Sequence, residues 1–175
     1  MDISERKDFY EKLYFHELDI RDKLDQRLKL SMTVFAIIGA MALYLFDDSR
    51  RDKIQDVSCI FVVLYFSACI SFLASIIFFI KSWYGYTYKM LPDAVTLENY
   101  YQDTFNHYMD IDERNAQNWT NESFKEYLLI TFRDYVAANT VNNDKKAYNL
   151  HLSNSAILIA FFLYLISYYP YYSIL

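Results

Sequence analysis

The chain has 175 residues, of which 54% are hydrophobic and 19% aromatic, and it contains only 2 glycines and 2 prolines. So few residues suited to tight turns and bulges argue against an all-β fold and favour long helices. A formal net charge of −5 argues against a surface that binds nucleic acid by neutralising phosphates, so no direct DNA binding is expected.

Residues 1–29 predict a charged amphipathic helix rather than a cleavable signal peptide. Charges of both signs fill this segment, and it has no apolar core followed by a small-residue cleavage site. Apolar side chains recur at roughly three- and four-residue spacing at Phe9, Leu13, Ile20, Leu24 and Leu28. Acid-before-base pairs four positions apart, such as Glu17 with Arg21 and Asp25 with Lys29, support a helix. We expect a solvated helix that leads into a membrane span; an interfacial or oligomer-contact helix is the alternative.

Two apolar runs predict a transmembrane hairpin over residues 30–80. Leu30 to Phe46 carries no charge and would extend roughly 26 Å as a helix, close to the thickness of a hydrocarbon core. Val57 to Ile80 would extend roughly 36 Å and is the stronger span. The charged stretch of residues 47–56 predicts a short connection between two antiparallel spans.

A helical region outside the membrane is predicted for residues 81–151. It opens with SWYGYTYKMLP, whose aromatic residues suit the headgroup level of a bilayer and whose Gly85 and Pro92 break a helix. A polar helix near residues 96–109 and then a loop are expected to follow. Basic residues near the span ends are more numerous on this side than in the 47–56 connection, so the positive-inside rule places the N-terminus and residues 81–151 in the cytoplasm.

A third span is predicted within residues 152–175. Ser123 and Glu126 fit a capping box that opens a helix, and no Gly or Pro follows until Pro170. One helix could therefore run from Ser123 through the region outside the membrane and into the third span. The expected fold is an all-α integral membrane protein with two to three transmembrane helices and a small helical cytoplasmic region.

No catalytic, cofactor-binding or metal-binding constellation is found in the sequence. The histidines at positions 16, 107 and 151 are far apart, and the 2 cysteines lie ten positions apart in one apolar run, too far to bridge on one helix. With 2 glycines a phosphate-binding loop is not expected. RNA-cleaving domains of the HEPN type need an Arg followed closely by a His, and no arginine here has a His at that spacing. We therefore expect no enzyme activity.

Polar side chains in and beside the apolar runs are the candidates for a functional surface. They are Ser67, Ser71 and Ser75, four apart on one face of the second span, and Asn139, Asn142, Asn143, Asn149 and Asn154, which lead into the third. Small residues on one face of a span commonly pack against another helix, and amides near the interface are commonly solvated. The alternative is that these side chains line a water-filled pore or its mouth.

The absence of charged residues from the predicted spans, and the number of spans, argue against several classes of transport protein. None of the spans contains an Asp, Glu, Lys or Arg, which argues against a proton-coupled transporter, a pump or a voltage sensor. Three spans in one chain cannot enclose a conduit alone, so a pore would require a ring of subunits.

The order of these features resembles that of small membrane effectors in bacterial anti-phage systems. The likeness begins with YEKLYFHELDIRDKLDQRLKL, followed at once by a span, a charged hairpin and a second span, and extends through FKEYLLITFRDYVAANTVNNDKKAYNLHLSNSAILIA. It is most similar to the family of small membrane accessory proteins of type VI-B CRISPR systems, and more loosely to retron-associated membrane effectors. The likeness rests on architecture, so no functional residue is carried over from these families.

The resemblance implies a homo-oligomeric, ring-like pore in the bacterial inner membrane. Such a pore would permeabilise or depolarise the membrane during phage infection and so enhance the effect of an associated RNA-guided nuclease that targets RNA. The resemblance also implies a HEPN-like helical fold, here without the nuclease's Arg/His pair. Its implied partners are further copies of the chain, the lipid bilayer and, through function, that nuclease; no cofactor is implied. The alternative hypothesis is a membrane anchor whose cytoplasmic region docks a partner nuclease or a nucleotide sensor.

Overall fold

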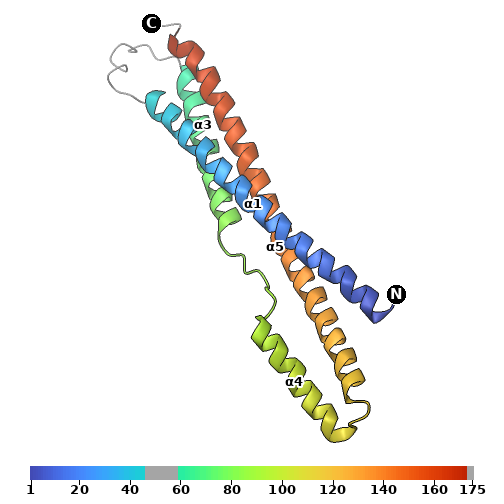
Figure 1. Cartoon of the computed structure of the whole chain (residues 1–175). Helices are drawn as coiled ribbons and strands as arrows, with labels where there is room; N and C mark the ends of the chain where they lie inside the picture. The colour runs from blue at the N-terminus through green and yellow to red at the C-terminus, as the bar shows by residue number, and fades with distance from the viewer. Residues whose placement is uncertain (46–58, 173–175) are drawn as a thin grey trace. The chain divides into compact units, whose positions relative to one another are not determined.

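The computed structural model of the chain is all-helical (Figure 1). The structure describes residues 1–45 and 59–172; within them helix accounts for 90% of the residues, and no strand occurs. The described helices are α1 (Ile3–Leu45), α3 (Cys59–Trp83), α4 (Ala94–Ile111) and α5 (Ala116–Tyr172). The all-α class predicted from the sequence is therefore confirmed, whereas the connection predicted for residues 47–56 lies outside the described residues.

Helices α1, α3 and α5 are each long and apolar enough to cross a membrane. Only 11% of the apolar window of α3 and 33% of that of α5 are buried within the chain. Most of these apolar side chains therefore face outward, as transmembrane side chains do toward lipid and as those of a water-soluble domain rarely do. The chain is a membrane protein with three candidate transmembrane helices, in agreement with the prediction of two to three.

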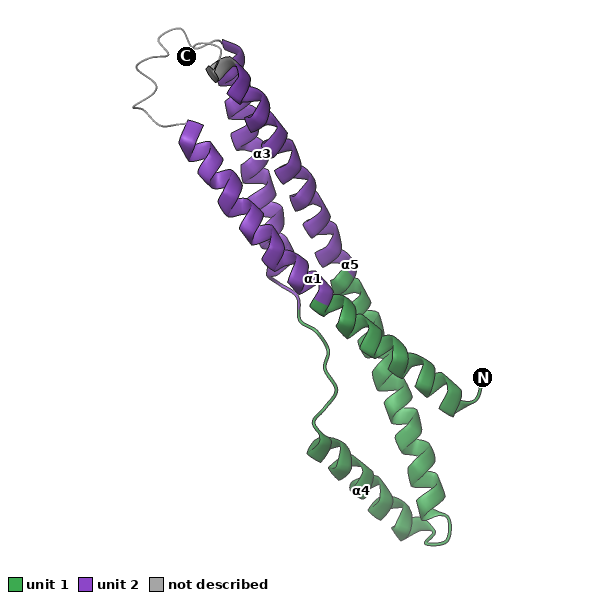
Figure 2. Cartoon of the chain, turned by 45° about the horizontal axis from the view of Figure 1, so that its top comes forward, with its two compact units in different colours: residues 1–22, 87–143 green, residues 23–86, 144–175 purple. Residues whose placement is uncertain are grey.

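The chain divides into two compact units, coloured purple and green in Figure 2. The purple unit comprises residues 23–86 and 144–175 and is called the membrane unit below because it holds the apolar runs. The green unit comprises residues 1–22 and 87–143 and is called the polar unit. Helices α1 and α5 are long enough to contribute residues to both units.

The membrane unit is a bundle of three helices, formed by the parts of α1, α3 and α5 that belong to it. Its buried core consists of Ile38, Leu45, Ala68, Ile157, Ala160 and Tyr164. Ala68 and Ala160 are fully buried, and their small side chains let the helix backbones approach closely. The ring of Phe35 on α1 lies 5.9 Å from that of Phe72 and 5.0 Å from that of Phe79, both on α3, which fixes the register of these two helices.

In the polar unit, α4 and the first part of α5 lie against each other through aromatic rings. The contacting pairs, with ring centroids 4.3, 5.4 and 5.7 Å apart, are Tyr100–Tyr127, Tyr101–Phe124 and Tyr108–Trp119. Helix α4 begins after Asp93, whose side chain accepts a hydrogen bond from the backbone N–H of Thr96 at 2.8 Å, the usual N-cap contact. The helix expected near residues 96–109 is thus confirmed.

The start of α5 differs from the sequence-based expectation. The helix begins at Ala116, whose backbone N–H donates to the carbonyl of Asp112, while the Asp112 carboxylate accepts from the N–H of Arg114 and the side-chain amide of Asn115. This turn opens the helix before Ser123, which lies inside α5 with its hydroxyl 2.8 Å from that of Tyr108. The capping box at Ser123 and Glu126 was therefore wrong, but the expectation of one helix continuous with the third span is confirmed.

Candidate functional site

A row of polar side chains runs along the interior of the membrane unit, between α5 and the other two helices. We call it the polar seam; its members are Asp25 and Ser31 of α1, Ser71, Ser75 and Ser82 of α3, Tyr86 just after α3, and Lys146, Asn149, Ser153 and Asn154 of α5. The contacts on α5 extend from residue 146 to residue 156, roughly 15 Å along the helix axis. The seam therefore covers about half the thickness of a hydrocarbon core.

Serine hydroxyls join α3 to α5. Ser75 donates to the carbonyl of Ser153 at 2.8 Å, and Ser153 donates back to the carbonyl of Ser75 at 3.0 Å. Both serines are fully buried, and their hydroxyl oxygens are 3.3 Å apart. One turn before Ser75, Ser71 donates to the carbonyl of Ala156 at 2.8 Å, and two turns after it, Ser82 donates to that of Lys146 at 2.9 Å. Small hydroxyl side chains allow close helix approach while their own hydrogen-bonding groups stay satisfied.

Amide and phenol groups continue the seam. The hydroxyl of Ser31 on α1 donates to the side-chain oxygen of Asn154 at 3.0 Å. The side-chain amide of Asn149 donates to the hydroxyl of Tyr86 at 3.1 Å, and that hydroxyl donates to the carbonyl of Lys81 at 3.0 Å. These bonds satisfy side chains that would be costly in hydrocarbon without partners.

An ion pair between Lys146 and Asp25 lies in the seam beyond the apolar runs. The Lys146 side chain is 5% exposed, whereas that of Asp25 is 48% exposed. A buried ammonium without a counter-ion is strongly unfavourable, and the Asp25 carboxylate stabilises Lys146 inside the bundle. Helical spacing predicts only partners three or four positions away, so it could not indicate this pair, whose members are 121 positions apart.

In the polar unit, three asparagines of α5 hold the extended segment of residues 87–91. Asn139 binds both the N–H and the carbonyl of Lys89, at 2.9 and 3.1 Å, and Asn142 donates to the carbonyl of Thr87 at 2.8 Å. Asn143 accepts from the hydroxyl of Tyr88 at 2.8 Å and donates to the backbone carbonyl and the carboxylate of Glu17 at 2.8 and 2.7 Å. These side chains supply the hydrogen bonds that a segment without helix or strand cannot make with itself.

The residues singled out from the sequence thus fall into separate places. Ser71, Ser75, Asn149 and Asn154 belong to the polar seam, whereas Asn139, Asn142 and Asn143 lie in the polar unit. Ser67 is exposed on α3 and is not a member of the seam. Other residues, among them Ser82 and Ser153, complete the seam; their only signal in the sequence is that they are polar residues within or beside apolar runs.

Within residues 1–45 and 59–172, no group of three or more His, Cys, Asp or Glu side chains could hold a metal ion. His16, His107 and His151 are exposed, and neither Cys59 nor Cys69 forms a disulfide. The seam therefore offers hydroxyls, amides and one ion pair, which can join helices to one another or bind water where the helices separate.

Comparison of the chain with protein-family models, with curated proteins and with solved structures finds no significant match.

Proposed function

We propose that the chain is one subunit of a homo-oligomeric membrane effector of bacterial antiviral defence, which opens a pore that permeabilises or depolarises the inner membrane. The observation that supports this proposal is the polar seam inside the membrane unit. Polar groups within a membrane are expensive and are commonly functional, and a simple anchor needs only one apolar helix of about 20 residues. The defence context rests on the order of features shared with CRISPR-associated and retron-associated membrane effectors.

The described arrangement is the closed state in this proposal. The seam side chains bind one another and the backbone, whereas the outward positions of α3 carry apolar residues such as Ile70, Leu73 and Ile77. A hydrogen bond of this kind between membrane helices contributes only about 0.6 kcal/mol on average. A trigger that stabilises a second arrangement can therefore separate the helices and expose the seam to water.

The polar unit supports assembly with further copies. Helix α4 contains no buried residue, and Val95 and Ile111 on it are 68% and 61% exposed. In the ring that we propose, neighbouring copies cover these two exposed apolar side chains, which lie near opposite ends of α4. The N-terminus and residues 81–151 lie in the cytoplasm, where the effector enhances the action of the associated RNA-guided nuclease.

The test is a dye-based measurement of membrane potential in bacteria that express the protein with its triggering system. Depolarisation is expected with the native chain and is expected to fall strongly in Ser71→Leu, because a leucine fills the seam with hydrocarbon. Ser67→Leu is the matched control, since Ser67 lies one turn away on the same helix but is exposed and outside the seam. An unchanged potential with the native protein would overturn the pore proposal. Equal depolarisation by the two variants, at equal amounts in the membrane, would overturn the assignment of the seam as its lining.

The second candidate is a membrane anchor that docks a partner nuclease or a nucleotide sensor. The exposed apolar residues of α4 favour it as well, because a partner protein would cover them as readily as a second copy. The oligomeric state in detergent separates the candidates: a ring of many subunits supports the pore, whereas a monomer or dimer cannot enclose a conduit and supports the anchor.

A further inference from the structure

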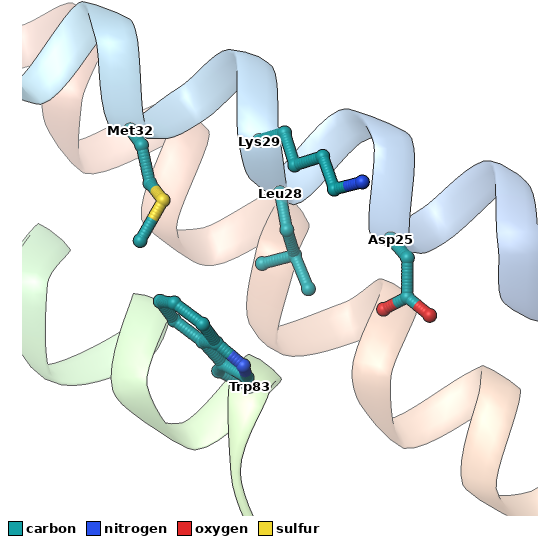
Figure 3. Close-up of a pocket in the computed structure, with 5 residues that line it drawn as sticks. All are labelled: Asp25, Leu28, Lys29, Met32 and Trp83. Atoms are coloured by element: carbon teal, nitrogen blue, oxygen red, sulfur yellow. The ribbon is translucent and has the colours of Figure 1, made fainter.

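A pocket of about 340 Å³ lies between α1 and α3 in the membrane unit (Figure 3). Leu28, Met32, Asp25 and Lys29 of α1 line it, and the indole of Trp83 lies opposite Leu28 and Met32. Leu28 is 5% exposed and forms the buried part of the lining, whereas Met32 and Trp83 are 42% and 48% exposed. The pocket is therefore apolar inside, open to the surroundings and bordered by two charged side chains. Its volume is that of a small-molecule site.

The pocket lies where the membrane surface is expected. Lys29 is the last charged residue before the apolar run of α1, and Trp83 ends α3 after its apolar run. The contact between Phe35 and Phe79 places both helices at the same level, and Trp83 is in ring contact with Phe79 at 5.6 Å. Tryptophan and lysine at the ends of spans are typical of the headgroup level of a bilayer. A ligand of this pocket would therefore reach it from the lipid.

The two charges on the border have opposite signs and are one helical turn apart. Within the described residues, the Lys29 ammonium has no hydrogen-bond or ion-pair partner, so it is available to a phosphate. Asp25 pairs with Lys146 through one oxygen, yet its side chain is 48% exposed, and a carboxylate can accept several hydrogen bonds. Residues four apart on a helix lie about 6 Å from each other, a separation that a phosphate linked to an amine by two carbons can span.

We propose that this pocket binds one molecule of a glycerophospholipid whose phosphate pairs with Lys29 and whose primary ammonium pairs with Asp25, that is, a phosphatidylethanolamine. The upper part of an acyl chain lies on Leu28, Met32 and the indole of Trp83. A lipid with an anionic headgroup alone would leave Asp25 facing a negative charge, and a choline headgroup has no N–H to donate to it. The site does not depend on whether the chain forms a pore.

Tryptophan fluorescence of the full chain can test the site. The protein has 2 tryptophans, Trp83 and Trp119, and Trp119 belongs to the polar unit. Trp119→Phe therefore leaves Trp83 as the sole reporter. This chain is placed in phosphatidylcholine nanodiscs that contain increasing fractions of a lipid brominated on its acyl chains. The same series of fractions is used for an ethanolamine, a choline and a glycerol headgroup. Half-maximal quenching of Trp83 is expected at a several-fold lower fraction of the ethanolamine lipid than of either of the others.

A lysine variant and its control assign the effect to the pocket. Lys29→Gln in the same background should weaken quenching by the ethanolamine lipid about fivefold, the effect of one lysine–phosphate contact near a membrane surface. Lys81→Gln is the control, because Lys81 is an exposed cation near the end of α3 that does not line the pocket, and it should leave quenching unchanged. Equal quenching by all headgroups would show contact with bulk lipid only and would overturn the proposal. Strongest quenching by the glycerol lipid, or equal losses in the two lysine variants, would also overturn it.

Discussion

The side-chain amide of Asn139 hydrogen-bonds to both the backbone N–H and the backbone carbonyl of Lys89, as a neighbouring β-strand would. Its side-chain oxygen accepts from the Lys89 N–H at 2.9 Å, and its side-chain amide donates to the Lys89 carbonyl at 3.1 Å. Asn139 is itself fully buried within α5. Backbone groups away from water must find partners, and this segment, which follows Gly85 and precedes α4, has no regular structure that could supply them. Asn139 therefore supplies both hydrogen bonds of the central residue of the 87–91 segment, which Asn142 and Asn143 hold on its N-terminal side.

Replacing Asn139 by alanine should loosen the 87–91 segment more than replacing Asn142 does. Asn139→Ala removes two hydrogen bonds and leaves a partly buried N–H without a partner, at a cost of about 1–3 kcal/mol. Asn142→Ala removes one bond, to the carbonyl of Thr87, with a smaller expected cost of about 1 kcal/mol. Hydrogen exchange measured by mass spectrometry on peptides that cover residues 86–92 would show the difference as faster exchange in the first variant. Equal exchange in both variants would mean that other contacts hold the segment.

Replacing Asp25 should lower the free energy of unfolding more than replacing its ion-pair partner Lys146. Asp25→Asn removes the carboxylate that pairs with the Lys146 ammonium, whose side chain is 5% exposed, whereas Lys146→Met leaves a carboxylate that is already 48% exposed. Removal of one member of a fully buried ion pair lowers the free energy of unfolding by about 3–5 kcal/mol. Because water already weakens the attraction of the half-exposed Asp25 carboxylate for Lys146, we expect a smaller loss of about 2 kcal/mol for Asp25→Asn. Lys146→Met should cost less, because water solvates the remaining charge and methionine keeps most of the packing. The free energy of unfolding in detergent measures both costs, and a larger cost for Lys146→Met would contradict this account.

The helices were predictable because their signals are local. Apolar runs of the right length and the scarcity of Gly and Pro identified the three long helices from neighbouring residues alone. The start of α5 was missed although its signal was also local: Asp112 makes the turn that opens the helix, and the serine at position 123 matched a capping pattern without being at a helix end. A capping pattern indicates only that a helix can start at that position. When the helix has already started upstream, as α5 does at Ala116, the same residues lie inside an ordinary helical segment.

The contacts of the candidate site were not predictable in the same way. Asp25 pairs with Lys146, 121 residues away in the sequence, and Asn139 forms hydrogen bonds with Lys89, 50 residues away. Such pairs depend on which helices are neighbours and on their register, which the contact of Phe35 with Phe72 and Phe79 sets in the membrane unit. The four-residue spacing of Ser71 and Ser75 showed that they share a helix face, but not that α5 lies against that face.

The reciprocal pair of Ser75 and Ser153 should show energetic coupling in a double-mutant cycle. Each change to alanine removes a hydroxyl that donates across the helix interface, at about 0.6 kcal/mol. Since the two hydroxyl oxygens are also 3.3 Å apart, the double variant should lose less than the sum of the single losses. Unfolding of the full chain in detergent measures the cycle, with Ser67→Ala as an exposed control that should be nearly neutral. Strict additivity would mean that the hydroxyls act independently.

Helix α4 should lose its first turn at low pH because its N-cap is an aspartate. The Asp93 carboxylate accepts hydrogen bonds from the backbone N–H of Thr96 at 2.8 Å and from its hydroxyl at 3.1 Å, and these bonds lower its pKa below the ordinary value of 3.8. A pKa lowered by folding means that the stabilisation is present above the unfolded value and is lost as the pH falls through the folded value. Helix α4 has no buried residue that would compensate for the lost cap.

Backbone chemical shifts of Thr96 and its neighbours, followed by NMR from about pH 6 downward, would report this transition as a loss of helical shift below the usual range of aspartate titration. Asp93→Asn is the matched control, because asparagine caps a helix as well as aspartate does but does not titrate. It should keep the first turn over the whole pH range, and Asp93→Ala should weaken it at every pH. An acid transition that persists in Asp93→Asn would assign the pH dependence to another group. The first candidate is Asp112 at the other end of α4, whose pKa is also lowered, chiefly by the hydrogen bond that it accepts from the side chain of Asn115.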